Sequence, residues 1–161
     1  MSSELLEELR AQLAAQAQAH QAAVDAVDAA AAARLGVNRT DLRCLEILLG
    51  RESTTPSQLA TELGLTTGSV TAMLDRLERL GYLTRAPGSG DRRKTQVRIT
   101  DAAARLAWEI YGPIAEEGAA EVATYTAAEL ATILDYLRRS QALQDRHRRR
   151  IDAIPPARHR S

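Results

Sequence analysis

The side chains that most often do chemistry in proteins are few and scattered in this sequence. The histidines are His20, His147 and His159, and Cys44 is the only cysteine. Metal sites and covalent catalysis need such residues at short, recognisable spacings, and the chain has no HExxH, CxxC, GxSxG or GxxxxGK(S/T) pattern. The Gly-Ser-Gly run at 88–90 is too short for a phosphate-binding loop. We therefore expect no enzyme activity, no metal site and no cofactor.

The single cysteine, Cys44, lies between Leu42 and Leu45 in a largely apolar run. A thiol reacts with peroxides mainly as the thiolate, and apolar surroundings disfavour its ionisation. The sequence therefore predicts a buried structural thiol at this position rather than a redox sensor.

Basic side chains, by contrast, are concentrated where they could meet a polyanion. The stretch 76–98 carries seven basic and two acidic residues, a net charge of +5, although the whole chain has a formal net charge of 0. The stretch 1–38 carries two basic and five acidic residues, a net charge of −3. Such segregation is typical of a protein that turns one face toward nucleic-acid phosphates.

A long N-terminal helix is the first element that could support such a face. From about residue 4 to 34 no glycine or proline interrupts the chain, and apolar residues recur at steps of three or four. The stripe consists of Leu6, Leu9, Leu13, Ala17, His20, Val24 and Val27. This helix is too long for one small core, which favours a helix shared between two copies over an ordinary core helix.

Two short helices joined by a glycine-containing turn form the centre of the chain. The first is expected to begin near Thr55 and to end at Gly64. Thr66 or Thr67 caps the second, which Gly81 ends. This arrangement is the signature of a helix-turn-helix.

A β-hairpin is expected directly after the second short helix. The apolar period changes there from 3.6 to 2, which indicates strands near 82–85 and 95–100 with a flexible tip between them. Further helices are expected at about 38–50, from residue 100 or 101 past Pro113, and from Thr126, whose Thr-Ala-Ala-Glu run fits a capping box. A hairpin in this position is a wing.

The predicted fold is mainly α with a small β-hairpin wing: a winged helix-turn-helix core flanked by N- and C-terminal dimerisation helices. We expect a dimerisation helix over 1–36, a DNA-binding domain over 37–100, dimerisation helices over 101–154 and a frayed tail over 155–161. The chain starts without the pattern of a signal peptide and has no apolar run of the ~18 residues that span a membrane. A cytoplasmic location is the expectation.

The residues expected to contact duplex DNA lie on the two short helices and in the wing. The first residues of a helix can face base edges in the major groove, and arginine suits a narrow minor groove. The candidates are Ser57, Thr67, Gly68, Ser69, Thr71, Ala72, Arg76, Asp91, Arg92, Arg93 and Lys94. Asp91 could hold one of the wing arginines in a charge-assisted pair.

The motifs of this region resemble the DNA-binding core of the MarR family. They are the helix-turn-helix, the run DRLERLGY from Asp75 to Tyr82, and the Asp-x-Arg of the wing at Asp91 and Arg93. The resemblance implies that Arg93 enters the minor groove and that Asp91 orients it. It also implies DNA contacts from Ser69 and Thr71 on the recognition helix.

At Ala72 the sequence departs from the family pattern, because many members carry a basic or polar base-reading residue there. Contact with thymine methyl groups or readout of DNA shape is then expected to supply more of the specificity. The family often senses small aromatic or lipophilic molecules in a crevice between its DNA-binding and dimer regions. His20, Trp108 and Tyr111 could line such a crevice, with core packing as the alternative role for each.

The expected function is that of a transcriptional regulator, a repressor that binds a pseudo-palindromic operator as a homodimer. A small-molecule effector that releases the DNA is a further expectation from the resemblance. The main alternative is a winged helix that binds another protein and not DNA. A helical adaptor would explain the amphipathic helices but not the basic hairpin.

Overall fold

The computed structural model describes residues 3–88 and 95–155. The elements follow in the order α1 (Ser3–Leu35), α2 (Arg39–Leu49), α3 (Pro56–Leu63), α4 (Thr67–Arg79), β1 (Leu83–Pro87), β2 (Thr95–Ile99), α5 (Asp101–Val122) and α6 (Ala127–Asp152). The chain forms two compact units, residues 1–112 and 113–161. The mainly helical fold with one antiparallel hairpin confirms the predicted fold class.

Local chemistry at the helix ends explains most of the boundaries. Asn38, Thr55 and Thr126 each form a reciprocal capping box with the residue three positions later. Thr66 accepts a hydrogen bond from the backbone N–H of Ser69 and thereby caps α4. These caps confirm the predicted helix starts. The starts could be predicted because each depends on a contact between residues close in the sequence.

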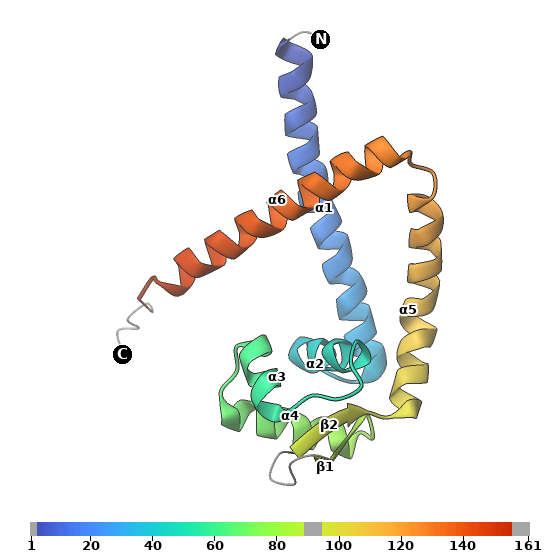
Figure 1. Ribbon diagram of the computed structural model, residues 1–161, viewed down its shortest axis with the longest axis vertical. Helices are drawn as coiled ribbons and strands as arrows, with labels where there is room; N and C mark the ends of the chain where they lie inside the picture. The colour runs from blue at the N-terminus through green and yellow to red at the C-terminus, as the bar shows by residue number, and fades with distance from the viewer. Residues whose placement is uncertain (1–2, 89–94, 156–161) are drawn as a thin grey trace. The chain divides into compact units, whose positions relative to one another are not determined.

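The core of the first unit lies where α2, α3 and α4 meet the hairpin and the end of α1 (Figure 1). Aliphatic side chains of these elements are buried, among them Leu48, Leu59, Leu77 and Val97, each with no exposed surface. In α1 only Ala31, Ala32 and Leu35 are buried. The greater part of this helix therefore extends beyond the core with its apolar stripe uncovered.

The hairpin differs slightly from the prediction. β1 runs from Leu83 to Pro87, not from Tyr82, because the Tyr82 N–H donates to the Leu77 carbonyl oxygen and closes the end of α4. Gly81 adopts the left-handed conformation (φ 75°) that this turn requires. Pro87 is tolerated because β1 pairs with β2 on one side only.

A bridge between Thr54 and Val97 adds a third segment to the hairpin. The Thr54 N–H donates to the Val97 oxygen at 3.0 Å, and the Val97 N–H donates back at 2.8 Å. Thr54 is itself buried. This bridge, which the sequence did not reveal, fixes the start of α3 against the base of the wing.

The second unit holds the end of α5, from Pro113, and the whole of α6. α5 continues past Pro113, as expected. α6 has no buried residue, and its large apolar side chains Ile133, Leu134 and Leu137 are 37–54% exposed. None of the described helices is both long and apolar enough to cross a membrane.

Candidate nucleic-acid interface

The helix-turn-helix consists of α3 and α4, and the first residues of both helices line the same groove. α3 starts with Pro56 after the Thr55 cap and ends at Gly64, which is left-handed (φ 64°). The Gly64 turn then brings the chain to the Thr66 cap of α4. Two capped N-termini close together suit an anionic partner, because helix N-termini carry partial positive charge.

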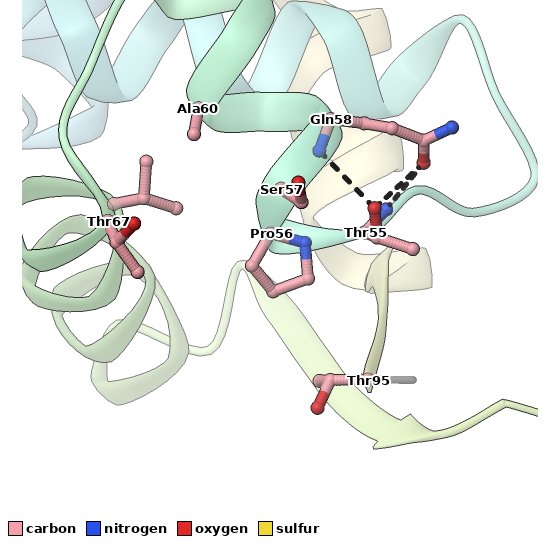
Figure 2. Close-up of a pocket in the computed structure, with 8 residues that line it drawn as sticks. Thr55, Pro56, Ser57, Gln58, Ala60, Thr67 and Thr95 are labelled. Atoms are coloured by element: carbon pink, nitrogen blue, oxygen red, sulfur yellow. Dashed lines mark hydrogen bonds between the residues drawn. The ribbon is translucent and has the colours of Figure 1, made fainter. Parts of the chain in front are cut away.

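A groove of about 680 Å³ lies between these helix starts and the strand β2. Figure 2 shows Ser57 and Gln58 on α3, Thr67 on α4 and Thr95 at the first position of β2 around this groove. Hydroxyl and amide groups thus lie on a concave surface beside the start of α4, together with the apolar side chains of Pro56, Ala60 and Val70. Such groups donate to phosphate oxygens and to base edges.

The first half of α4 presents its small residues to solvent. Val70, Met73, Leu74 and Leu77 are buried and hold the helix on the core. The predicted contact residues of this helix, Thr67, Gly68, Ser69, Thr71 and Ala72, are all exposed, as is Ser57 on α3. All six candidates are therefore accessible, and Ser57 and Thr67 line the same groove.

Two of the α4 hydroxyl groups already have local partners. The Thr71 Oγ1 donates to the Thr67 carbonyl oxygen at 3.0 Å, and the Ser69 Oγ lies 2.9 Å from the Thr66 Oγ1. Each hydroxyl retains acceptor capacity beyond these contacts. They remain able to accept from the exocyclic amino groups of bases or from ordered water.

Arg76 has a different place from the one that the sequence suggested. Its Nε and Nη2 donate to the two carboxylate oxygens of Asp41 at 2.8 and 2.5 Å, and Asp41 is completely buried. The hydrogen bond to Asp41 raises the pKa of Arg76 above its ordinary value. Arg76 thus fastens α4 to the start of α2, and we remove it from the candidate DNA contacts.

Most other arginines of the first unit are also neutralised by nearby acids. The pairs are Arg10 with Glu7, Arg39 with Asp25 and Asp28, Arg43 with Glu46, Arg51 with Glu62, Arg85 with Asp75 and Glu78, and Arg98 with Glu52. The net charge of the 76–98 stretch therefore overstates what this surface offers to phosphates. The predicted wing contacts Asp91, Arg92, Arg93 and Lys94 lie outside the described residues.

Arg79 is a candidate that the sequence analysis did not single out. It is exposed, and its Nε donates to the Asp75 carbonyl oxygen at 3.3 Å, with no acidic partner among the described residues. At 3.6 residues per turn it lies on the same side of α4 as Gly68 and Ala72. That shared side is the signal that identifies it.

Cys44 is buried, as predicted, with no exposed surface. Burial, reinforced by the nearby Asp41 carboxylate, raises the pKa of the thiol from 9.0 to about 12. Across residues 3–88 and 95–155, no three His, Cys, Asp or Glu side chains gather in a way that could hold a metal ion.

The three residues proposed for an effector crevice lie in different surroundings. His20 is exposed on α1, and Trp108 is 67% exposed with its ring against Gly112, so neither packs in the core of the unit. Tyr111 is half-buried in a small apolar cavity beside Leu35, Leu42 and Tyr82. Its hydroxyl is buried without a hydrogen-bond partner among the described residues.

Comparisons with known proteins agree with this geometry. A family profile described as MarR family matches residues 35–94. The uncharacterised HTH-type transcriptional regulator YcgE of Bacillus subtilis (strain 168) is 32% identical over 122 residues, which cover 76% of this chain and 79% of the relative. The HTH-type regulator PecS of Dickeya dadantii (strain 3937) is 44% identical over 46 residues, 29% of this chain and 28% of the relative.

Solved structures show the same fold. A mutant of MepR from a multidrug-resistant clinical isolate of S. aureus has a TM-score of 0.65 at 15% identity. The match covers 82% of this chain and 96% of the MepR chain. A mutant of MarR from E. coli has a TM-score of 0.57 at 23% identity, covering 80% and 96%. The family profile and the coverage of YcgE decide the assignment: the chain is a DNA-binding transcriptional regulator, not an enzyme, and belongs to the MarR family.

Proposed function

We propose that the protein is a repressor that binds a pseudo-palindromic operator as a homodimer, with α4 in the major groove. The exposed first half of α4 is the observation that carries this proposal. Its small side chains allow the helix backbone to approach base edges closely, and the groove beside it carries hydroxyl and amide groups among apolar side chains. A two-fold dimer then reads half-sites about one helical turn, ~10 bp, apart.

The uncovered apolar faces support the homodimer. Leu6, Leu9 and Leu13 on α1 are 36–50% exposed, and Leu134 and Leu137 on α6 are about as accessible. Contiguous apolar surface of this kind marks interaction sites in soluble proteins. A second copy of the chain offers matching surfaces, since a two-fold interface is self-complementary.

One structural neighbour was solved in complex with DNA. This protein, overoxidised AbfR bound to DNA, has a TM-score of 0.50 at 17% identity and covers 89% of this chain. In the proposed complex, the wing residues Arg92, Arg93 and Lys94 supply positive charge, with Asp91 orienting Arg93. This role rests on the sequence.

A footprint on the DNA upstream of the gene tests the proposal, together with a gel shift of two matched variants. Ala72→Glu places a carboxylate in the centre of the exposed α4 face, whereas Ala102→Glu places one on the exposed start of α5. We expect the first to abolish the footprint and the second to leave it unchanged. Equal DNA binding by both variants would show that the α4 face does not contact DNA, whereas a parent that gives no footprint at all would favour a winged helix that contacts protein and not DNA.

We further infer that an effector would act at Tyr111. The cavity there measures about 10 Å³, room for no more than a single water, whereas sites for drug-sized ligands measure about 300–1,000 Å³. An aromatic ligand would therefore have to separate α5 from α2 and offer an acceptor to the Tyr111 hydroxyl. Calorimetry with salicylate as a probe tests this, and equal binding by the parent and Tyr111→Phe would contradict it.

A further inference from the structure

One face of α6 carries a cluster of arginines that the DNA-reading unit does not use. Arg138, Arg146, Arg149 and Arg150 are exposed and have no acidic partner among the described residues. At 3.6 residues per turn they fall within an arc of about 120°, and Arg139 lies in the same arc. We call these five residues the α6 arginine face.

The acids near this face do not cancel it. Asp135 pairs with Arg139 at 2.9 Å, and Asp145 borders the arc beside Arg138. Five arginines against two carboxylates leave a net charge of +3. Arg148 lies outside the arc and pairs with Asp152. In the first unit, by contrast, seven arginines are ion-paired. The α6 arginine face is therefore the main cluster of uncompensated positive charge in the described part of the chain.

Helix electrostatics explain only part of the cluster. Arg149 and Arg150 lie in the last turn, where cations are stabilised by the helix dipole. The dipole effect fades within one turn, and Arg138 and Arg146 lie one or more turns earlier. The cluster is therefore longer than a favourable helix end requires.

The apolar residues of α6 lie mainly on the other side of the helix. At 3.6 residues per turn, Ile133 and Leu137 project away from the arginine face, and Leu134 lies outside its arc. If a second copy covers these residues, as proposed above, the arginine face still meets solvent. The face is about 18 Å long, more than the ~12 Å width of the DNA major groove, so it could reach phosphates of both strands.

We propose that the α6 arginine face binds the phosphate backbone of duplex DNA without sequence preference. The inference rests on the proposed function, since it assigns a second DNA contact to a DNA-binding regulator. Arginine suits this partner because its planar guanidinium forms paired hydrogen bonds to phosphate oxygens. Its contribution is sequence-independent affinity, whereas α4 and the wing supply operator preference.

A salt titration with a 60-bp random-sequence duplex tests the proposal in the full-length protein. The test variant is Arg146→Gln/Arg149→Gln/Arg150→Gln. The control is Arg10→Gln/Arg43→Gln/Arg148→Gln, which removes the same charge from arginines that are ion-paired with Glu7, Glu46 and Asp152. Glutamine keeps good helix propensity, and circular dichroism checks that all three proteins are folded.

We expect the slope of log affinity against log salt to become shallower by about 2–3 in the test variant, since each lost phosphate contact contributes about 0.9. The control should change it by less than half a unit. Equal slopes for all three proteins would overturn only the proposed DNA contact of the α6 arginine face. If the parent bound neither the random duplex nor the operator, the proposed function would be overturned as well. If the test variant no longer binds phosphatidylserine vesicles but keeps the parent's salt dependence of DNA affinity, the face binds lipid and the proposal is overturned.

Discussion

Asp41 and Arg76, 35 positions apart in the chain, join the start of α2 to the last turn of α4 by two hydrogen bonds. The same Asp41 carboxylate accepts from the Asn38 N–H and its backbone N–H donates to the Asn38 side chain. One buried acid thus completes a helix cap and positions α4, the helix proposed to read the DNA. The orientation of α4 is coupled in this way to the end of α1, three residues before Asn38.

Removing this carboxylate should destabilise the fold markedly. Asp41→Ala leaves the Arg76 guanidinium without its partner and one cap donor unsatisfied, so we expect a loss of about 2–4 kcal/mol in the free energy of unfolding. Urea denaturation at pH 7 measures it. Asp152→Ala, which breaks the exposed pair with Arg148, is the control and should change stability by no more than about 0.5 kcal/mol. Similar small losses in both variants would show that the Asp41 pair is not stabilising.

Two tyrosines give opposite expectations for the same substitution. The Tyr82 hydroxyl donates to the Leu35 carbonyl oxygen at 2.7 Å, so Tyr82→Phe should lower the free energy of unfolding by about 1 kcal/mol. The buried Tyr111 hydroxyl has no such partner among the described residues, so Tyr111→Phe should leave stability unchanged or raise it by about 1 kcal/mol. Denaturant titrations of both variants check this. A loss at Tyr111 equal to that at Tyr82 would reveal a bound partner at the Tyr111 hydroxyl.

Cys44 should make stability fall at alkaline pH. Its pKa rises from 9.0 to about 12 on folding, so between these values the folded state holds a proton that the unfolded state has lost. Stability therefore decreases as pH rises from 9 toward 12, by up to about 1.4 kcal/mol per pH unit. Cys44→Ala removes this dependence, and the difference in slope between the parent and the variant is the measurement.

The same burial predicts that peroxide does not act through Cys44. The parent and Cys44→Ser should keep the same operator affinity after peroxide treatment, because the thiolate is scarcely populated at neutral pH. Release of the parent alone from DNA would identify Cys44 as a redox sensor.

The apolar stripe of α1 should hold two copies together. Leu13 is 50% exposed in a single chain, and Leu13→Glu would bury a charge in the proposed interface. We expect the parent to sediment as a dimer and Leu13→Glu to sediment as a monomer or to unfold. Gln18→Glu, well to the side of the stripe on the same helix, should remain dimeric. A folded parent monomer at micromolar concentration would contradict the proposed homodimer.

Features set by neighbouring residues could be predicted from the sequence, and features set by distant residues could not. The helix starts are examples of the first kind. The capping residues Asn38, Thr55 and Thr126 each bond to the residue three positions later, so the local sequence predicts where these helices begin. The Asp41–Arg76 pair and the Thr54–Val97 bridge join segments 35 and 43 positions apart, and no local pattern marks them.

The same reason explains why the charge of the DNA-binding region was overestimated. A net charge summed along the sequence counts Arg85 and Arg98 as free to bind phosphate. In the folded chain they form ion pairs with Glu78 and Glu52. The exposed face of α4, by contrast, was predicted correctly, because the 3.6-residue period alone separates Val70 and Leu74 from Thr71 and Ala72.

Two arginines of the wing are expected to contribute unequally to operator binding. Arg93→Ala should weaken operator binding more than Arg98→Ala, by about 1–3 kcal/mol, because an arginine in a narrow minor groove gains from focused negative potential. Arg98 lies on β2, is half-exposed, and already pairs with Glu52 at 3.1 Å, so its loss should cost little. Arg93 lies outside the described residues, and its role follows from the Asp-x-Arg motif.

Asp91→Ala separates the position of Arg93 from its charge. It should partly reproduce the effect of Arg93→Ala on operator affinity, because it frees the arginine without removing its charge, and it should leave affinity for random duplex unchanged or slightly higher. Gel-shift titrations at one fixed salt concentration compare the three variants with the parent. Small and equal effects of all three would mean that the hairpin is only solvated, and the minor-groove role of the wing would have to be abandoned.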